Sequence, residues 1–210
     1  MAAERSALHL IQFTREPVPG RVKTRMLPTL QPAQACELHR ELTLWTLGQL
    51  CRFASRPVEL SVAGDPQHPF FATCRALRDI TVTTQAAGDL GARMHAALAA
   101  GLALSRKVIL VGSDCPGIDA QYLAGAEEAL EYEDVVLGPA LDGGYVLIGV
   151  RRVQREWFEG IAWGGEAVFS ETVARLEATD TGFAALAPLA DIDRPEDLEL
   201  WRSMQAGGEP

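Results

Sequence analysis

Short apolar runs alternate along the chain with longer segments whose apolar residues recur every three or four positions. The runs are rich in β-branched residues and stop at Gly, Asp or Pro, which is typical of strands buried in a parallel sheet. They lie at Ala7–Phe13, Pro57–Ala63, Ile80–Thr84, Val108–Gly112, Asp134–Pro139, Tyr145–Val150 and Phe183–Leu189.

The periodic segments between these runs predict helices. In the clearest one, Leu90, Met94, Leu98 and Leu102 follow Asp89, which is a favourable N-cap residue. Helices are predicted over 32–51, 70–77, 89–105, from Asp119 through Leu130, over 166–177, and from Pro195 onward.

Strands that alternate with helices predict a three-layer α/β fold with a mostly parallel central sheet. The turn Asp142-Gly143-Gly144 separates two adjacent strands and predicts one antiparallel excursion in that sheet. Repeats, low-complexity linkers and shifts in composition are absent from the sequence, so a single domain is predicted over residues 1–210.

Composition and charge exclude several classes of function. The chain is 48% hydrophobic and 22% charged, with a net charge of −9, which disfavours a surface for nucleic acid. The four cysteines form no CxxC pair, so a zinc site is not expected. A polar start and the lack of a membrane-length apolar run predict a cytoplasmic protein without a membrane span.

Asp114 stands just beyond the strand at 108–112, in the segment Ser113-Asp114-Cys115-Pro116-Gly117. Ligands of open α/β sheets bind beyond the carboxyl ends of the strands, so Asp114 is placed to hold a ligand or a metal. A simple turn-capping role is the alternative. Asp193 could supply a second carboxylate for Mg²⁺ or Mn²⁺, although an acid just before Pro195 also suits helix capping.

The loop over residues 14–28, TREPVPGRVKTRMLP, is basic in an otherwise acidic chain. Arg21, Lys23 and Arg25 lie within five residues, and their side chains are suited to phosphate oxygens. The prolines stiffen the loop and lower the entropy lost on binding. A solvated loop with incidental charge is the alternative. The spacing excludes a P-loop.

Two other glycine-containing stretches are weaker candidates. In GPALDGGYVLIG, residues 138–149, Asp142 could hold an acceptor hydroxyl, whereas the alternative is a plain hairpin turn. In GDLGARM, residues 88–94, the Gly91 amide or Arg93 could lie near a phosphate, whereas the alternative is helix capping and packing.

The scattered histidines are interpreted as structural, because no Ser-His-Asp or Cys-His arrangement stands out. Cys115 adjoins Asp114 but has no histidine near it in sequence. It is therefore interpreted as a small packing residue.

Five motifs together resemble a bacterial family of GT-A-type, glycosyltransferase-like transferases in the nucleotide-diphospho-sugar transferase superfamily. The chain is also similar, more distantly, to phospholactate guanylyltransferase and molybdenum-cofactor guanylyltransferase. The motifs are FTREPVPGRVKTRMLP, GDLGARM, VGSDCPGI, GPALDGGYVLIG and DIDRPEDL.

The resemblance implies a Rossmann-like GT-A fold with a nucleotide pocket at the strand ends. It places Asp114 and Asp193 at the metal and the loop after the first strand around the nucleotide phosphates. Two departures are Arg15, where the family usually has Lys, and Asp114-Cys115-Pro116, which lacks a full DxD. The expected phosphate-binding residues are Arg15, Gly20, Arg21, Lys23, Arg25, Gly91 and Arg93, and the expected catalytic residues are Lys23, Asp114 and Asp142.

We therefore expect a metal-dependent transferase with a nucleotide or nucleotide-sugar donor and a small-molecule acceptor. Glycosyl transfer and nucleotidyl transfer with pyrophosphate release both stay open. A non-catalytic nucleotide-binding module and a plain interaction domain are the alternatives from other classes.

Overall fold

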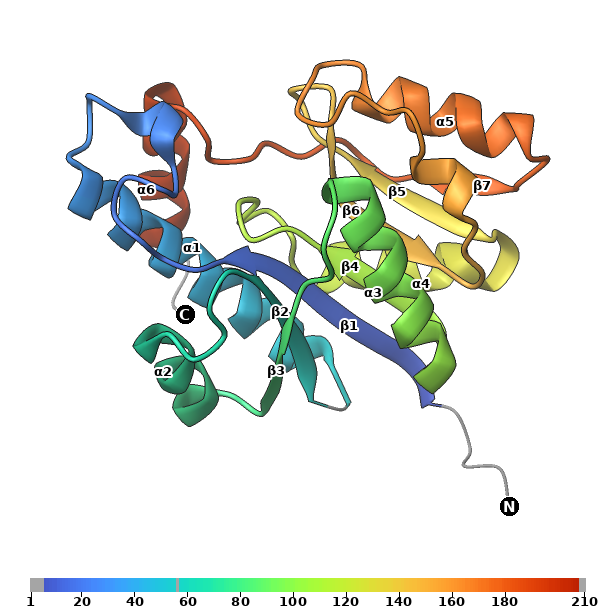
Figure 1. Ribbon diagram of the computed structural model, residues 1–210, viewed down its shortest axis with the longest axis horizontal. Helices are drawn as coiled ribbons and strands as arrows, with labels where there is room; N and C mark the ends of the chain where they lie inside the picture. The colour runs from blue at the N-terminus through green and yellow to red at the C-terminus, as the bar shows by residue number, and fades with distance from the viewer. Residues whose placement is uncertain (1–5, 56, 208–210) are drawn as a thin grey trace. The chain divides into compact units, whose positions relative to one another are not determined.

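The computed structural model describes residues 6–55 and 57–207, which form an α/β fold around a seven-stranded sheet (Figure 1). The strand order is β3-β2-β1-β4-β6-β5-β7. The strands are β1 (Ser6–Arg15), β2 (Val58–Ala63), β3 (Ile80–Thr84), β4 (Ser105–Val111), β5 (Val135–Pro139), β6 (Tyr145–Val150) and β7 (Phe183–Ala185). The α/β, Rossmann-like prediction is confirmed.

The described residues form six α-helices, five of them between strands and the sixth after β7. Pro32 opens the first of them, where its missing N–H is not needed. The helices are α1 (Pro32–Phe53), α2 (Pro69–Leu77), α3 (Leu90–Leu104), α4 (Ala120–Tyr132), α5 (Val168–Ala178) and α6 (Leu198–Gly207); short 3₁₀ turns are η1 (Thr24–Met26), η2 (Arg155–Phe158) and η3 (Pro195–Asp197).

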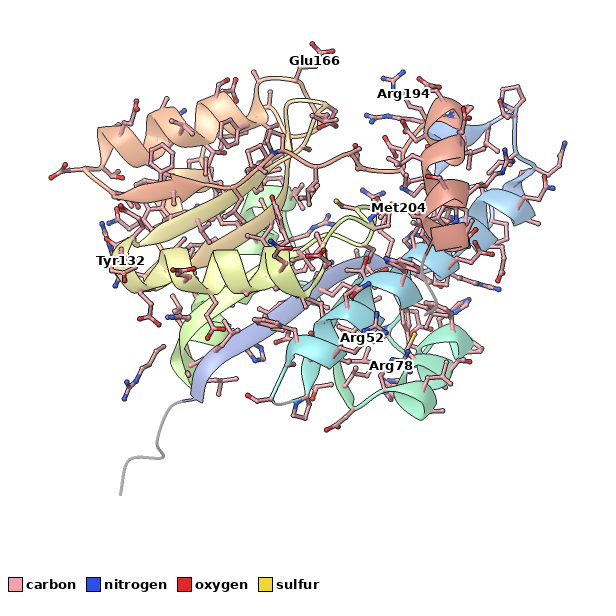
Figure 2. The ribbon with its side chains drawn as sticks, turned by 180° about the vertical axis from the view of Figure 1, so that it is seen from behind. Arg52, Arg78, Tyr132, Glu166, Arg194 and Met204 are labelled. Carbon is pink, nitrogen blue, oxygen red and sulfur yellow. The ribbon has the colours of Figure 1, made fainter. Side chains whose placement is uncertain are left out.

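The chain divides into two compact units. The first contains Gln85–Val111, Gln121–Leu189 and the start of β1 up to Ile11. Its strand β6 pairs antiparallel with both β4 and β5, so the predicted antiparallel excursion at Asp142-Gly143-Gly144 is confirmed. Helix α3 is nearest the viewer in Figure 1, and α4 is nearest in Figure 2, which is seen from behind.

The second unit contains Gln12–Thr84, Gly112–Ala120 and the stretch from Ala190 onward. Strands β2 and β3 pair in parallel, and helix α6 lies beside α1 in Figure 1. An apolar cluster joins these two helices to the loops around them. Its buried members are Met26, Ala35, Leu38, Leu42, Ile192 and Trp201.

The last predicted strand, 183–189, is too long: β7 ends at Ala185. Pro188 has no N–H to donate to a neighbouring strand, which limits regular pairing. The segment beyond β7 still makes separate backbone hydrogen bonds to β5: Leu186 N donates to Leu137 O, and Leu189 N donates to Pro139 O.

Asp89 caps α3 as predicted, because its side chain accepts a hydrogen bond of 2.8 Å from Ala92 N. The sequence pattern did not predict the 3₁₀ turns. Among the described residues, no helix is long and apolar enough to cross a membrane.

Candidate functional site

The candidate site lies in the second unit, in the loop that follows β4. Ser113 fixes this loop to the end of β1, because its hydroxyl donates to Phe13 O at 2.8 Å and accepts from Gln12 Nε2 at 2.8 Å. Asp114 follows, and its carbonyl accepts a 2.8 Å hydrogen bond from Ile192 N. Three segments far apart in sequence therefore meet around Asp114.

Lys23 is the cation at the centre of this arrangement. Its side chain is only 2% exposed, and Nζ donates to Ile192 O at 2.5 Å. Nζ also lies 2.9 Å from Asp114 Oδ1 and 3.8 Å from Asp193 Oδ1. A buried ammonium is stable only when it is paired, and here two carboxylates and a carbonyl surround it.

The backbone at Lys23 adopts an unusual conformation that turns its side chain toward these partners. Its φ of 49° lies in the left-handed region, which is unusual for a residue other than Gly, Asn or Asp. Lys23 immediately precedes η1, whose first bond runs from Met26 N to Lys23 O at 3.0 Å. The turn directs the lysine inward while the neighbouring Thr24 and Arg25 stay exposed.

Asp193 contacts two basic residues of the loop, Lys23 and Arg25. Its Oδ2 accepts a 2.5 Å hydrogen bond from the Arg25 guanidinium, and its Oδ1 faces Lys23. Helix capping, the alternative considered for Asp193, is performed by Asp197, whose carboxylate accepts from the backbone N–H groups of Asp193 and Arg194. The Asp193 side chain is therefore left to contact Lys23 and Arg25.

The Asp114 carboxylate has two unlike oxygens. Oδ1 is buried and makes no well-directed hydrogen bond within the described part of the chain, so its contact with Lys23 is an ion pair. The side chain as a whole is 45% exposed, so its accessible surface lies away from Oδ1. Burial on its own would raise the pKa of Asp114, but the charge of Lys23, helped by His39 and Arg15, outweighs burial and keeps this pKa below its usual range.

His39 on α1 belongs to the same region and was not predicted as a site residue. It is buried, and its Nε2 lies 3.0 Å from Arg15 O and 3.4 Å from Thr14 Oγ1. Burial is the main cause that lowers the pKa of His39, although Asp114 opposes the shift. His39 and Thr43 recur at helical spacing on the buried face of α1, a signal that the sequence already contained.

The remaining loop residues predicted to bind phosphate share this unit. Arg15, Gly20 and Arg21 are all exposed, and Arg21 N donates to Val18 O at 3.0 Å within a turn. Gly20 has a φ of 79°, a conformation that glycine adopts without strain. These residues are accessible to a ligand, in contrast to Lys23.

Gly91, Arg93 and Asp142 belong to the first unit, where each has a local partner. A Cβ on Gly91 would lie 2.6 Å from the Trp163 ring, so close packing explains this glycine. Arg93 Nε donates to Gly88 O at 2.9 Å, and Asp142 Oδ1 accepts from Gly144 N at 2.9 Å within the hairpin turn.

Cys115 is buried beside Asp114. Burial raises the pKa of its thiol to about 12, so almost none of it is thiolate at neutral pH. This agrees with the interpretation of Cys115 as a packing residue.

The donors near Lys23 suit a hard divalent cation. Mg²⁺ is usually held by one or two carboxylates together with water and substrate phosphates. Asp114 and Asp193 supply two carboxylates that face one point, now taken by Lys23 Nζ. The described residues contain no cluster of three or more acidic, histidine or cysteine ligands.

The fold defines a class, the nucleotide-diphospho-sugar transferase-like proteins. The chain belongs to the DUF2064 family, described as uncharacterized proteins conserved in bacteria, whose profile matches residues 46–165. No curated protein sequence matches the chain.

Solved structures agree with that class. A protein from Desulfovibrio desulfuricans G20, provisionally described as a nucleotide-diphospho-sugar transferase, is 29% identical with a TM-score of 0.85, over 95% of this chain and 88% of that one. The 4-diphosphocytidyl-2C-methyl-D-erythritol synthase of Anaerococcus prevotii DSM 20548 is 10% identical with a TM-score of 0.66, over 96% and 99%. A CTP complex of CMP:2-keto-3-deoxy-manno-octonic acid synthetase is 11% identical with a TM-score of 0.61, over 96% and 99%.

These relatives confirm the predicted fold and the suspected family. The protein from Desulfovibrio desulfuricans G20, described as a nucleotide-diphospho-sugar transferase, supports the prediction that this chain is a transferase. The two synthases share too little sequence with this chain to indicate more than the fold.

Proposed function

We propose that this protein is a Mg²⁺- or Mn²⁺-dependent transferase that uses a nucleotide-activated donor and a small-molecule acceptor. The observation that carries the proposal is the buried Lys23 ammonium between Asp114 and Asp193, at the end of a sheet strand. The nucleotide-using transferases among the structural neighbours support it. The free thiols of the four described cysteines suit a reducing cytoplasm.

The cationic loop would bind the donor phosphates. Arg25, Arg21 and Arg15 are exposed and can form paired hydrogen bonds with phosphate oxygens. Gly20 lets the backbone approach the ligand closely. Lys23 adds a compact positive charge beneath them, which becomes available when a phosphate competes with Asp114 and Asp193 for the ammonium group.

Asp114 and Asp193 would hold the divalent cation. When bound, that cation would neutralise phosphate charge and act as a Lewis acid. Asp114 offers its exposed oxygen without giving up Lys23, whereas Asp193 first has to release Arg25. Asp142 remains the proposed partner of the acceptor hydroxyl, and Gly91 and Arg93 remain weaker candidates for phosphate contacts.

Charge stabilisation is the catalytic contribution that these residues can make. Negative charge builds on the bridging phosphate oxygen as the donor bond breaks, and fixed cations in a partly buried site stabilise it. Transfer of this kind needs little covalent participation by the protein. Lys23 and Arg25 are therefore proposed to stabilise the leaving group.

Product analysis distinguishes the two reaction types. Release of pyrophosphate from a nucleoside triphosphate identifies nucleotidyl transfer, and release of a nucleoside diphosphate from a nucleotide-sugar identifies glycosyl transfer. The absence of a full DxD and the Lys23-Thr24-Arg25 segment favour nucleotidyl transfer, whereas the resemblance to glycosyltransferase-like proteins favours glycosyl transfer.

A thermal-shift screen of nucleotides and nucleotide-sugars, with and without Mg²⁺ or Mn²⁺, tests the proposal. A ligand that binds only the folded state raises its stability by mass action. We expect a metal-dependent increase in melting temperature with at least one donor class. Tight metal-independent binding without turnover would favour the non-catalytic module, and no binding at all would favour an interaction domain.

A further inference from the structure

A pocket of about 440 Å³ lies in the second unit, among α1, the end of α2 and α6. Its walls are mainly apolar and include Leu44, Trp45, Leu77 and Trp201. The labelled Arg78, at the end of α2, also lines it (Figure 2). The volume falls within the range of about 300–1,000 Å³ that is typical of small-molecule sites.

The aromatic wall is held in place without a ligand. The Trp45 and Trp201 rings meet edge to face, with centroids 5.3 Å apart and an interplanar angle of 82°. Trp45 Nε1 donates to Pro116 O at 3.0 Å, and Trp201 Nε1 lies 3.4 Å from Glu41 Oε2. Because both indole N–H groups already have acceptors, the rings are fixed, and little entropy is lost on binding. Trp201 is only 4% exposed, so the accessible aromatic surface is that of the partly buried Trp45.

The pocket has one cation that lacks an acidic partner. Arg78 lines the wall, and its Nη1 donates a hydrogen bond to Leu77 O at 3.0 Å. Within residues 6–55 and 57–207, no carboxylate forms a salt bridge with it. Glu41, the acid of the pocket, is engaged by Trp201. A guanidinium beside an aromatic wall is suited to an anionic group carried on a flat ring.

We propose that this pocket binds a small molecule that has an aromatic ring and one anionic group. The ring would lie against Trp45, which Trp201 supports from the buried side, and the anion would accept hydrogen bonds from Arg78. None of the lining residues is among those assigned to the proposed transferase site, so this inference goes beyond that function and stands without it. The lone cation favours a ligand with a single anionic group over a polyanion.

The tryptophans of the chain provide a direct test. All four are labelled with 5-fluorotryptophan, each resonance is assigned with a Trp→Phe variant, and naphthalene-1-sulfonate is titrated while ¹⁹F spectra are recorded. We expect saturable shifts at Trp45 and Trp201 and none at Trp157 and Trp163, which belong to the other unit. Shifts of similar size at all four would overturn the proposal.

A charge variant tests the anion contact. Arg78→Gln should weaken naphthalene-1-sulfonate binding about tenfold, because a charged hydrogen bond is lost. Binding of the neutral 2-naphthylmethanol should be unchanged. Arg52→Gln, an exposed arginine in the last turn of α1 that is also labelled in Figure 2, is the matched control and should bind like wild type.

Equal affinity of wild type and Arg78→Gln for the sulfonate would contradict the proposal. Concentration-dependent shifts at Trp45 and Trp201 without any probe would also contradict it, because a second copy of the chain would then cover the pocket. If no nucleotide binds in the thermal-shift screen, the transferase proposal fails, but the naphthalene-1-sulfonate titration still tests the pocket. The two proposals can therefore be refuted independently.

Discussion

The chain has two lysines, one in each unit, and their surroundings differ in an informative way. Counted over the whole residue, backbone included, Lys23 and Lys107 are each only 8% exposed. Each donates a hydrogen bond to a backbone carbonyl and contacts an acidic side chain. Lys107 Nζ lies 2.5 Å from Glu131, a single carboxylate whose side chain is 63% exposed. Burial and pairing of a lysine are therefore ordinary features of this fold.

Lys23 differs because two acids from distant segments face it. Asp114 follows β4 and Asp193 precedes η3, and Arg25 also contacts Asp193. The backbone at Lys23 adopts a left-handed φ, whereas Lys107 lies within the extended strand β4. Several charges brought together by an unusual backbone conformation indicate function better than one buried ion pair does.

The largest expected effect comes from removing each lysine in turn. Lys23→Met should lower the free energy of unfolding by about 3 kcal/mol, because two carboxylates lose their shared cation. Lys107→Met should cost less than about 1 kcal/mol, because Glu131 can turn into water. Urea denaturation of both variants measures the difference, and equal losses would remove the distinction between the two lysines.

Asp114→Asn should next affect ligand binding more than stability. Loss of the carboxylate charge should weaken metal-dependent nucleotide binding by roughly a hundredfold, or about 2–3 kcal/mol. Calorimetry with the donor found in the thermal-shift screen measures this. Glu131→Gln removes the corresponding charge beside Lys107 and should leave binding unchanged. A similar loss in both variants would indicate a general charge effect.

The variant Gly91→Ala tests whether Gly91 contacts a donor phosphate. The added Cβ would press on Trp163, so the variant should lose about 1–2 kcal/mol of stability. If packing alone explains this glycine, the nucleotide affinity of the folded variant stays that of wild type. Weaker affinity at temperatures well below the melting transition would instead support a phosphate contact at Gly91. The matched control is Gly125→Ala, where a Cβ meets only ordinary contact with Leu186.

The smallest expected effect is a pH dependence. The pKa of Asp114 is lowered in the folded protein, so its ionised form stabilises the fold above the unfolded pKa, near 4. This contribution, about 1 kcal/mol for a half-exposed side chain, is lost as pH falls through the folded pKa. Urea midpoints of wild type and Asp114→Asn should therefore converge below about pH 4, and a constant difference would contradict the lowered pKa.

Local patterns were sufficient to predict most of the fold. The β-branched run at Ile80–Thr84 and the four-residue spacing from Leu90 to Leu102 each coincide with one element. The hairpin at Asp142-Gly143-Gly144 followed from turn chemistry. The strand ending at Ala185 was overestimated, because the effect of Pro188 on pairing depends on neighbours that the local pattern does not show.

The candidate site was predictable only in part, because its partners are far apart in the chain. The sequence indicated Lys23, Asp114 and Asp193 separately, but Lys23 reaches Asp193 across most of the chain, and its hydrogen bond to the neighbouring Ile192 spans 169 positions. The role of His39 was missed because its carbonyl partner on Arg15 carries no side-chain signal. Similarly, Asp197 rather than Asp193 caps the helix, a choice made by backbone geometry.

The left-handed backbone at Lys23 has a consequence for how this loop responds to an arriving anion. A non-glycine residue in that conformation is less stable than in an extended or right-handed one by about 1 kcal/mol, and here the surrounding acids hold it there. Once a competing anion draws the ammonium away, relaxation of the main chain returns part of the energy spent in breaking the ion pairs. The left-handed backbone at Lys23 therefore lowers the free-energy cost of moving its side chain toward a bound anion.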